Sequence, residues 1–462
     1  MKAIHDPSGA LASGLAAIRQ QYQVPEGFPP EVLAAAEHAA ARKPGPEHED
    51  RTDEPFVTLD PATSTDLDQA FHIEPSGSDL ILHYAIADVA WFVDDGDPID
   101  AEAWKRGETL YLPDGKAGLY PPALAEHAAS LLPDGPRPAV VFSIRLGPDG
   151  EARLEAASRA LIRSRAKLAY DSVRPDQLPA DFARFAERMN AAEAARGAAR
   201  VDPPEQEVEA LGNGRYALSF RPLLLSERAN ATLSLAANLA IARALHEAGT
   251  GLFRVMAGPT AAAMSRLRST AAGLGMDWPE STDLKTLERT LDQRNPNHAA
   301  FMLAVRRAGG GAGYAPWIPG VTPWHEAISA TYAHATAPLR RLADRYVIRA
   351  TLAVAGGKPV DPEVEAAFQR LPAVMAKADA LSGQIERAVI DLAETVMLRG
   401  REGEAFRACV TDADGDSARV QLLDLPIIAR ARIAGATAGQ RVSLNLTGID
   451  IKQRRLQFAP SD

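Results

Sequence analysis

The chain has 462 residues, enough for two to four domains of about 150 residues each. Its hydrophobic content of 46% and charged content of 24% are typical of globular proteins, and no run approaches the roughly 18 apolar residues of a membrane span. The net charge of −10 argues against indiscriminate binding to nucleic acid, so any such contact must come from local basic patches. The N-terminus lacks the apolar core of a signal peptide, and the one cysteine, Cys409, excludes an intramolecular disulfide. We therefore expect a cytoplasmic protein with no membrane contact and with Cys409 buried.

Residues 1–50 predict two alanine-rich helices with a break between them. The first is expected at 10–21 and the second at 31–41, because the intervening segment 24–30 is rich in proline. Two short helices around a turn are typical either of half a helix-turn-helix module or of an appendage that packs on a larger domain. The charged segment 42–54 then predicts a linker.

Three aspartates stand in a short polar loop between predicted strands at 56–59 and 70–74. They are Asp60, Asp66 and Asp68. Two carboxylates about 4 Å apart repel by roughly 4 kcal/mol at an effective dielectric near 20, so three converging acids need cations. Carboxylates without His or Cys partners suit magnesium or manganese better than zinc. The alternative is that these residues serve only as turn and cap residues.

The next part of the chain predicts further strands and then helices. Strands are expected at 80–89, at 138–146 and 151–159 around a Gly-Pro-Asp-Gly turn, and within 203–225 around a turn at 212–214. A mainly helical stretch is expected from residue 164, and a long helix at 226–247. One face of that helix carries an apolar stripe that should pack in the core, formed by Leu233, Ala237, Ile241 and Leu245.

The segment 332–344 predicts a helix N-terminus, with Pro338 as the first helical residue and Arg340 in the first turn. Free backbone N–H groups and an adjacent guanidinium make such a place suitable for an anion such as a phosphate. The alternative is that Arg341 and the arginines after it form a solvated helix face. We expect His334 to be structural.

A long helix is expected at 363–398, with a break near Pro372. From residue 403 the pattern changes to short alternating strands, at 406–411, 418–423, 427–433, 441–451 and 454–458. Five short strands in about 55 residues match the size of an OB-type β-barrel. Lys452, Arg454 and Arg455 lie near its last turn, either on a nucleic-acid-binding face or as an ordinary basic turn.

The acidic stretch 60–70 and the stretch 332–344 resemble the two signatures of the ribonuclease II (RNB) family of exoribonucleases, in the family's order and about 270 residues apart. The runs 83–89 and 107–113 resemble the same family.

The resemblance implies a multidomain α+β fold. It places an RNB catalytic domain of mixed sheet and helices at 51–400 and an OB-type RNA-binding domain at 403–460. The family commonly carries cold-shock domains ahead of the catalytic domain, and the small helical module at 1–50 stands in their place here.

The resemblance also implies a metal site. Asp60, Asp66 and Asp68 are expected to hold one or two magnesium ions, with manganese as the alternative, and Asp68 is the expected catalytic residue. Gln69 stands where the family has a fourth acid. Its carbonyl oxygen can bind a metal but brings no negative charge, so its part in the site is weaker.

Three further residues receive roles from the same resemblance. Arg340 is expected to stabilise the phosphate being cleaved and is the second catalytic residue, with Arg341 beside it on the RNA. Tyr111 is expected to stack on a base near the scissile end, a contact that accepts every base.

The function expected from these residues is metal-dependent, processive 3′ to 5′ hydrolysis of RNA to nucleoside 5′-monophosphates, in RNA turnover. The substrate would be single-stranded RNA, with partly paired RNA tolerated, and the protein a monomer. The alternative is a catalytically silent RNA-binding protein on the same fold, favoured by Gln69 and by Ala231 and Thr232, which stand where the family carries helix acids. A third reading is hydrolysis of another phosphodiester, such as DNA.

Overall fold

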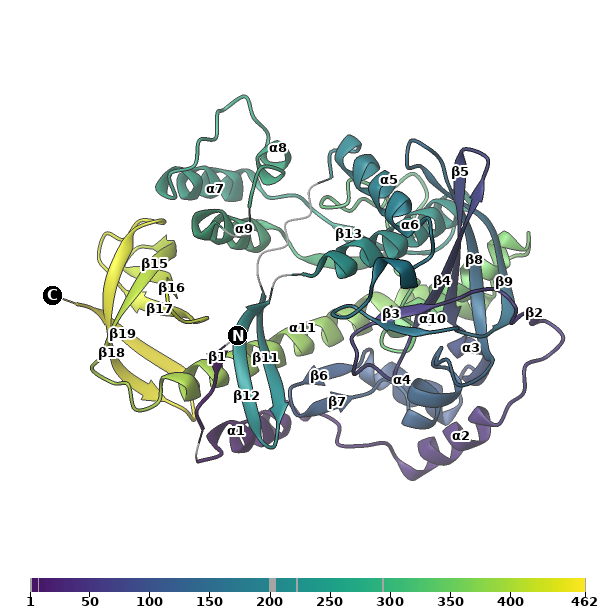
Figure 1. Cartoon of the computed structure of the whole chain (residues 1–462), viewed down its shortest axis with the longest axis horizontal. Coiled ribbons are helices and arrows are strands. Elements are labelled where there is room, and N and C mark those ends of the chain that lie inside the picture. Colours follow the sequence, from purple (N-terminus) through teal and green to yellow (C-terminus); the bar gives the residue numbers. More distant parts are fainter. Residues whose placement is uncertain (1, 7, 199–204, 222, 293–294, 462) are drawn as a thin grey trace.

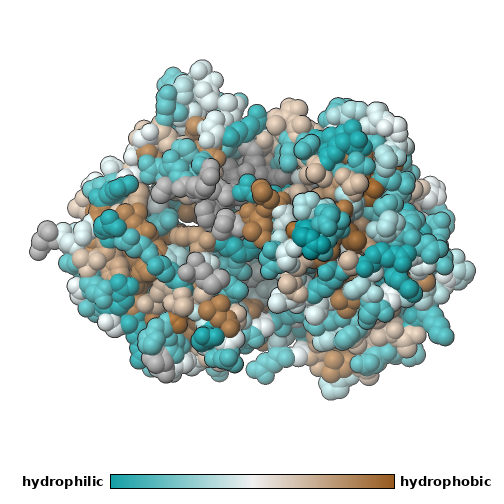
Figure 2. Space-filling model, viewed as in Figure 1, coloured by the Kyte–Doolittle hydropathy of each residue, from teal (hydrophilic) through white to brown (hydrophobic). Residues whose placement is uncertain are grey.

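The computed structural model describes the whole chain except residues 1, 7, 199–204, 222, 293–294 and 462. A sheet with its covering helices forms one end of the molecule and a small β-barrel forms the other, and the long helix α11 runs between them (Figure 1). On the face seen in Figure 2, apolar residues are dispersed among hydrophilic ones rather than gathered in one broad patch. None of the helices in the described part of the chain is long and apolar enough to span a membrane.

The central sheet has the strand order β2-β9-β8-β5-β4, with β2 and β9 parallel and the other neighbours antiparallel. Its strands are β2 (Glu49–Arg51), β4 (Gln69–Ser76), β5 (Asp79–Ala87), β8 (Arg137–Leu146) and β9 (Ala152–Ile162). The strands expected at 70–74, 80–89, 138–146 and 151–159 are confirmed. Their apolar positions are buried under α6 (Leu225–Glu247), whose expected stripe is fully buried.

One expected helix is replaced by a strand. Residues 164–170 were expected to open a helical stretch, but Lys167–Ala169 form β10, which pairs in parallel with β3 (Thr58–Asp60). This strand forms because it pairs with β3, which lies more than 100 residues earlier in the chain. The Thr58 N–H of β3 also donates to the Ala166 carbonyl at 3.0 Å. The helix begins only at α5 (Phe182–Ala195).

The helix α11 (Pro362–Leu398) is continuous, so the expected break near Pro372 is wrong. Proline removes one hydrogen bond from a helix. Here Leu371 and Met375 are fully buried on either side of it, and that packing holds the helix together.

The remaining elements connect these parts. They are β1 (Lys2–Ala3), α3 (Val89–Phe92), α4 (Pro98–Arg106), β6 (Leu110–Leu112), β7 (Gly115–Ala117), the π-helix η1 (Ala123–Ala128), the 3-10 helix η2 (Pro175–Gln177), β11 (Glu205–Gly212), β12 (Arg215–Arg221), β13 (Leu252–Met256), α7 (Ala261–Gly273), α8 (Leu284–Glu288), α9 (Pro296–Ala308), β14 (Ala312–Pro316) and α10 (Leu342–Ala355). The hairpin β11–β12 turns at 212–214 as expected, and β1 pairs with β12.

The two N-terminal helices pack on different parts of the molecule. The helix α1 (Ala10–Gln21) lies on α11 and buries its apolar face in the core that continues into the barrel. The helix α2 (Pro30–Ala40) lies on α4 and η1 and buries its apolar face in the core of the central sheet. This is the arrangement of a packing appendage rather than of paired helices.

The C-terminal barrel has the strand order β17-β16-β15-β18-β19, and contact between β17 and β19 nearly closes it. Its strands are β15 (Ala405–Asp414), β16 (Ser417–Leu422), β17 (Ile428–Arg432), β18 (Arg441–Asp450) and β19 (Arg455–Pro460), as the sequence predicted. Cys409 is buried, also as expected.

Glu394 of α11 provides a pH-dependent contact between the helix and the barrel. Its carboxylate accepts hydrogen bonds from the Ile428 N–H at 2.8 Å and from Gln206 Nε2 at 2.6 Å. Burial nevertheless raises the pKa of Glu394 to about 8. The folded state therefore keeps a proton that the unfolded chain loses near pH 4.3, so the free energy of unfolding falls as the pH rises from about 4 to about 8 and is level above that.

The Glu394→Gln variant is expected to lose this dependence, because the amide oxygen can accept both hydrogen bonds without carrying a charge. Thermal unfolding at pH 6 and pH 9 should show a smaller loss of Tm for Glu394→Gln than for the unchanged protein. An equal fall in Tm in the two proteins would contradict the raised pKa of Glu394.

Candidate active site

The acidic loop crosses one edge of the central sheet. β3 ends at Asp60 and β4 begins at Gln69, so the loop between them carries the other two aspartates. Two hydrogen bonds to the Ser130 hydroxyl hold the loop in place. The hydroxyl donates to the Thr65 carbonyl at 2.7 Å and accepts from the Leu67 N–H at 2.9 Å. These hydrogen bonds fix the loop conformation without using the carboxylates.

The segment before α10 lies directly against this loop. The Leu339 N–H donates to Asp68 Oδ1 at 2.7 Å, and Arg340 Nε lies 3.7 Å from Asp68 Oδ2. The helix begins at Leu342, so the expected start at Pro338 is wrong. Residues 338–340 form only a turn, in which the Arg341 N–H donates to the Ala337 carbonyl at 3.0 Å. Arg341 itself is extended and bridges to Glu108, and this separates the turn from the helix. The free N–H expected to meet a phosphate thus meets Asp68 instead.

Two of the three loop acids have raised pKa values, because their ionised forms are unfavourable in this environment. Burial, and then the charge of Asp66, raise the pKa of Asp60 to about 7. Burial likewise raises the pKa of Asp68 to about 8, although Arg340 and the Leu339 N–H act in the opposite direction. A nearby cation would favour the ionised form of both acids.

Asp66 already has cationic and hydroxyl partners. Lys116 Nζ lies 2.9 Å from Asp66 Oδ1 and 3.1 Å from Glu126 Oε1, and the Tyr111 hydroxyl donates to Asp66 Oδ2 at 3.3 Å. A second lysine, Lys167, donates to the Ala62 carbonyl at 2.9 Å within the loop.

The residues present fit a hard divalent cation in donor type and charge, because the loop carries three carboxylates and no His or Cys. Among the residues that the structure describes, however, no three His, Cys, Asp or Glu side chains stand close enough to hold an ion. Asp66 points to Lys116, and Asp68 points to Leu339 and Arg340. Asp60, Asp66 and Asp68 remain the side chains that would hold a metal.

Gln69 links the two signature segments. Its Nε2 donates to the Thr336 carbonyl at 2.8 Å, and its Oε1 accepts a hydrogen bond from the Tyr84 hydroxyl. The Thr336 hydroxyl in turn lies 2.9 Å from the Ser234 hydroxyl on α6. The amide is engaged at both ends, so only the second lone pair of Oε1 is left for a metal.

The Gln69→Glu variant tests this link. A carboxylate cannot donate to the Thr336 carbonyl, and placing one there should lower the free energy of unfolding by about 1–3 kcal/mol. Chemical denaturation measures the loss. Gln20→Glu, on the exposed face of α1, is the matched control and should change stability little. An unchanged stability in Gln69→Glu would show that the link contributes nothing.

Tyr111 and Arg341 differ in how they meet the site. Tyr111 in β6 is 55% exposed beside Asp66, with its ring open to solvent. Arg341 instead donates two hydrogen bonds to the Asp344 carboxylate. Its Nε lies 3.0 Å from Asp344 Oδ1, and one terminal nitrogen lies 2.8 Å from Oδ2. The structure thus brings Asp60, Asp66, Asp68, Arg340 and Tyr111 together, and turns the side chain of Arg341 into the fold.

His334 of the same segment is a packing residue, as expected. Its Nδ1 lies 2.9 Å from the Tyr314 hydroxyl, and its ring packs edge-on against Tyr314 and Tyr332. Burial, together with nearby arginines, lowers its pKa well below the usual range, so the ring is neutral.

The sequence reading missed Lys116 and Tyr84. Lys116 lies opposite Tyr111 across the short hairpin β6–β7. The Pro-Asp-Gly run at 113–115 is a turn signal that would have placed these two side chains on the same face. The sequence around Tyr84 gives no comparable signal, because the register between β4 and β5 decides that Tyr84 meets Gln69.

Comparisons with known proteins add the following. A family model described as the RNB domain matches residues 48–356, and one described as the RNase II-type exonuclease C-terminal S1 domain matches residues 404–461. Nucleases with the RNB domain generally depend on a divalent metal. Ribonuclease R of Aquifex aeolicus is 26% identical over 422 residues, which are 85% of this chain and 59% of that protein, so the chain spans little more than half the length of this relative.

Solved structures of two proteins share the fold. RNase R of Mycoplasma genitalium in complex with ribose-methylated single-stranded RNA matches with a TM-score of 0.85 at 21% identity, over 99% of this chain and 79% of that chain. The same protein has also been determined in complex with double-stranded RNA. Yeast Ssd1, described as a pseudonuclease, matches with a TM-score of 0.68 at 17% identity, over 96% of this chain and 59% of that chain.

Proposed function

The chain belongs to the RNB family, and from this premise we propose that it is a 3′ to 5′ exoribonuclease. It hydrolyses RNA processively, with a divalent metal, and releases nucleoside 5′-monophosphates. The observation that carries the proposal is the direct contact between Asp68 and the segment Leu339–Arg340, which brings together two signatures 271 residues apart. A buried acid with a raised pKa beside an exposed arginine is an arrangement typical of catalytic sites.

Each residue of the site has a separate task. Asp60, Asp66 and Asp68 would hold magnesium, or manganese in its place, and a bound divalent ion supplies Lewis-acid activation of water and of the phosphate. Arg340, which is 43% exposed at its side chain, offers guanidinium N–H groups to a phosphate oxygen. Its contact with Asp68 fixes the direction from which it reaches the phosphate.

Tyr111 takes the base next to the scissile phosphate. Its exposed ring gives a flat apolar surface, while its hydroxyl is anchored on Asp66. Any base can stack on such a ring, which suits an enzyme that degrades RNA of every sequence. Arg341, held by Asp344, supports the turn that carries Arg340 and acts on the RNA through it.

The Tyr111→Ala variant is expected to weaken binding of a short single-stranded RNA by about 5- to 150-fold, since one base stack contributes roughly 1–3 kcal/mol. Tyr111→Phe is the matched control: it keeps the ring and should retain most of the affinity. Fluorescence anisotropy with labelled RNA in EDTA measures both. If the phenylalanine variant were as weak as the alanine variant, the hydroxyl and not the ring would be the contact.

The substrate proposed is RNA with a single-stranded 3′ end, and the enzyme continues into partly paired regions. It acts as a monomer in the cytoplasm, in RNA turnover. The protein should be incubated with 5′-labelled RNA carrying a 3′ tail, with magnesium or manganese, or with EDTA. Products that shorten from the 3′ end only with a metal support the proposal, and DNA of the same sequence should stay intact.

A catalytically silent RNA-binding protein is the second candidate. It is favoured by Gln69, which occupies the place of a fourth acid, and by the similarity in fold to a pseudonuclease. In the same assay, RNA binding without shortening under either metal would establish this candidate and refute the first.

A further inference from the structure

Two charged side chains, those of Lys116 and Glu126, lie next to the acidic loop without belonging to it. Lys116 comes from β7 and Glu126 from the π-helix η1. Lys116 Nζ lies 2.9 Å from Asp66 Oδ1 and 3.1 Å from Glu126 Oε1, and Glu126 Oε2 accepts a hydrogen bond from Thr65 Oγ1 at 3.0 Å. Turns of π-helix are rare and occur frequently at functional sites. The protein therefore holds an ammonium group between a loop aspartate and an acid outside the loop.

The position of this ammonium is fixed by the hairpin β6–β7. Lys116 pairs with Tyr111 across the hairpin, and the two side chains meet different oxygens of Asp66, Oδ1 and Oδ2. The turn of the hairpin is anchored as well, because Arg19 of α1 binds the Asp114 carboxylate at 2.9 and 2.8 Å. The Lys116 side chain is only 24% exposed, so it lacks the freedom that makes ion pairs between surface residues weak.

The other two aspartates of the loop lack a partner of this kind. Within the described residues, no side chain forms a hydrogen bond or an ion pair with the Asp60 carboxylate. Asp68 meets Arg340 only at 3.7 Å, and the second lysine near the loop, Lys167, is turned to a backbone carbonyl instead. Magnesium is usually bound by one or two carboxylates together with phosphate oxygens of the substrate. Asp60 and Asp68 meet that requirement, whereas a metal ion on Asp66 Oδ1 would face the ammonium.

We propose that the Lys116 ammonium takes the place of a second metal ion, so that the acidic loop binds one divalent ion rather than two. This inference rests on the proposed function, in which the loop aspartates hold the metal. Two cations on one carboxylate oxygen repel each other strongly at such short range, so a second ion would have to displace Lys116. The ammonium offers three N–H groups that can stabilise negative charge, but it cannot activate water as a metal ion does. Asp66 can still contribute Oδ2, whose contact with the Tyr111 hydroxyl is the longer one at 3.3 Å.

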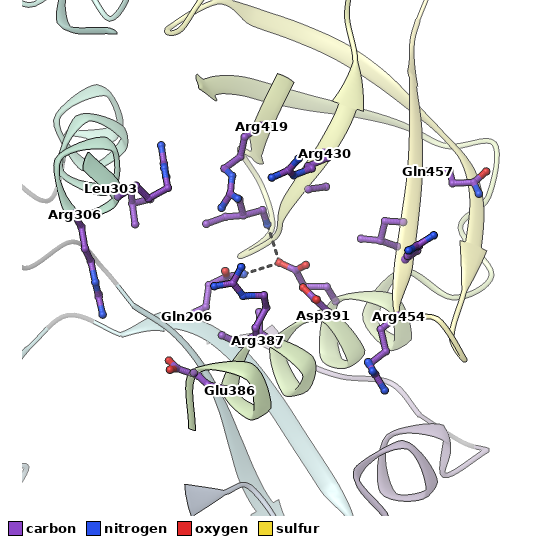
Figure 3. A pocket seen from close by; sticks show the side chains of 18 residues that line it. Gln206, Leu303, Arg306, Glu386, Arg387, Asp391, Arg419, Arg430, Arg454 and Gln457 are labelled. Carbon is purple, nitrogen blue, oxygen red and sulfur yellow. Dashed lines mark hydrogen bonds between the residues drawn. The ribbon is translucent and has the colours of Figure 1, made fainter. Parts of the chain in front are cut away.

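A count of bound ions can test this inference because the rest of the described chain offers no competing site. Outside the loop, no three His, Cys, Asp or Glu side chains in that part of the chain are arranged to hold a metal. A cavity of about 650 Å³ between the barrel and the helices α9 and α11 contains Asp391, but Arg387, Arg419 and Arg454 lie around it (Figure 3). Seven arginines and three acids line this cavity in all, so its charge repels a cation.

Binding of Mn²⁺ to the metal-free protein, without RNA, measures the number of ions directly. Electron paramagnetic resonance of free Mn²⁺ during a titration should give about one ion for each unchanged chain and about two for Lys116→Gln, which keeps a polar side chain but no charge. Lys116→Arg keeps the charge and should bind about one ion. Lys105→Gln is the matched control, since Lys105 is 71% exposed and pairs with Glu102 within α4 rather than with a loop acid. It should also bind about one ion.

Thermal unfolding gives a second measurement that needs no RNA and shows that each variant is folded. In EDTA, Lys116→Gln should have a lower Tm than the unchanged protein, because Asp66 and Glu126 then stand close together without a cation. Saturating magnesium should raise the Tm of Lys116→Gln more than that of the unchanged protein, since ions that bind only the folded state stabilise it and two stabilise it more than one. Lys105→Gln should show neither effect.

The outcomes separate this inference from the proposed function. A change from about one ion to about two in Lys116→Gln supports the inference, and if the unchanged protein then cleaves no RNA, the nuclease alone is refuted. Two ions in the unchanged protein, or equal numbers in the unchanged protein and Lys116→Gln, overturn the inference and leave the nuclease in place. No bound ion in the unchanged protein overturns both the inference and the metal dependence of the proposed nuclease.

Discussion

Replacing Asp68 by asparagine is expected to lower the rate of RNA hydrolysis by about 10³-fold or more and yet to leave the fold at least as stable. The loss of rate follows from removing one carboxylate of the proposed metal site, since metal activation contributes several kcal/mol to such reactions. The retained stability follows from the burial of Asp68, whose pKa is raised to about 8. An asparagine oxygen can still accept the Leu339 N–H without a buried charge.

The sign of the pH effect is fixed by the pKa of Asp68. The folded state holds the proton up to about pH 8 while the unfolded chain loses it near pH 3.9, so the unchanged protein loses stability as the pH rises between these values. The Tm advantage of Asp68→Asn should therefore grow from pH 5 to pH 8 in EDTA and be constant above. A variant that unfolds more easily at pH 8.5, or that still degrades RNA at a comparable rate, would contradict the role given to Asp68.

Replacing Arg340 by alanine is expected to lower kcat by about 10²- to 10³-fold, the usual cost of removing one donor that stabilises charge in a transition state. The side chain is 43% exposed, so its loss should cost little stability. Arg340→Lys keeps the charge but loses the two-pronged donor geometry, and should recover only part of the rate. Single-turnover degradation of a short RNA separates the chemical step from binding.

Arg341 is the internal control for this prediction. It precedes α10 next to Arg340, but its guanidinium is bound to the fully buried Asp344, which also accepts the Ala337 N–H. Arg341→Ala should therefore lower the Tm, while the molecules that remain folded hydrolyse RNA at nearly the unchanged rate. If Arg341→Ala reduced kcat as strongly as Arg340→Ala at unchanged Tm, the two arginines would share the phosphate.

The main elements of the fold could be read from the sequence because their signals are local. The strands of the sheet and barrel have apolar runs bounded by glycine and aspartate turns, and α6 has one continuous apolar stripe. The strand Lys167–Ala169 could not be read, since it exists through its pairing with Thr58–Asp60. The start of α10 was misplaced for the same kind of reason: Arg341 is held extended by Glu108, more than 200 residues earlier.

The candidate site was predictable where residues form contiguous signatures, as for Asp60, Asp66, Asp68 and Arg340. The engagement of Arg341 was in reach as well, because Asp344 stands only three residues later, in the first turn of α10. The hydrogen bonds of Gln69 were not. They depend on the register between strands and on a segment 267 residues away, which no local pattern encodes.

The continuity of α11 has a consequence for how the molecule unfolds. The first half of the helix, from Val364 to Met375, is built into the core of the central sheet, and the second half, from Ile385 to Leu398, into the core shared with the barrel. Helix formation is cooperative, so melting one half weakens the end of the other. The two cores are thereby coupled, and we expect the body around the central sheet and the barrel to unfold together rather than as two independent domains.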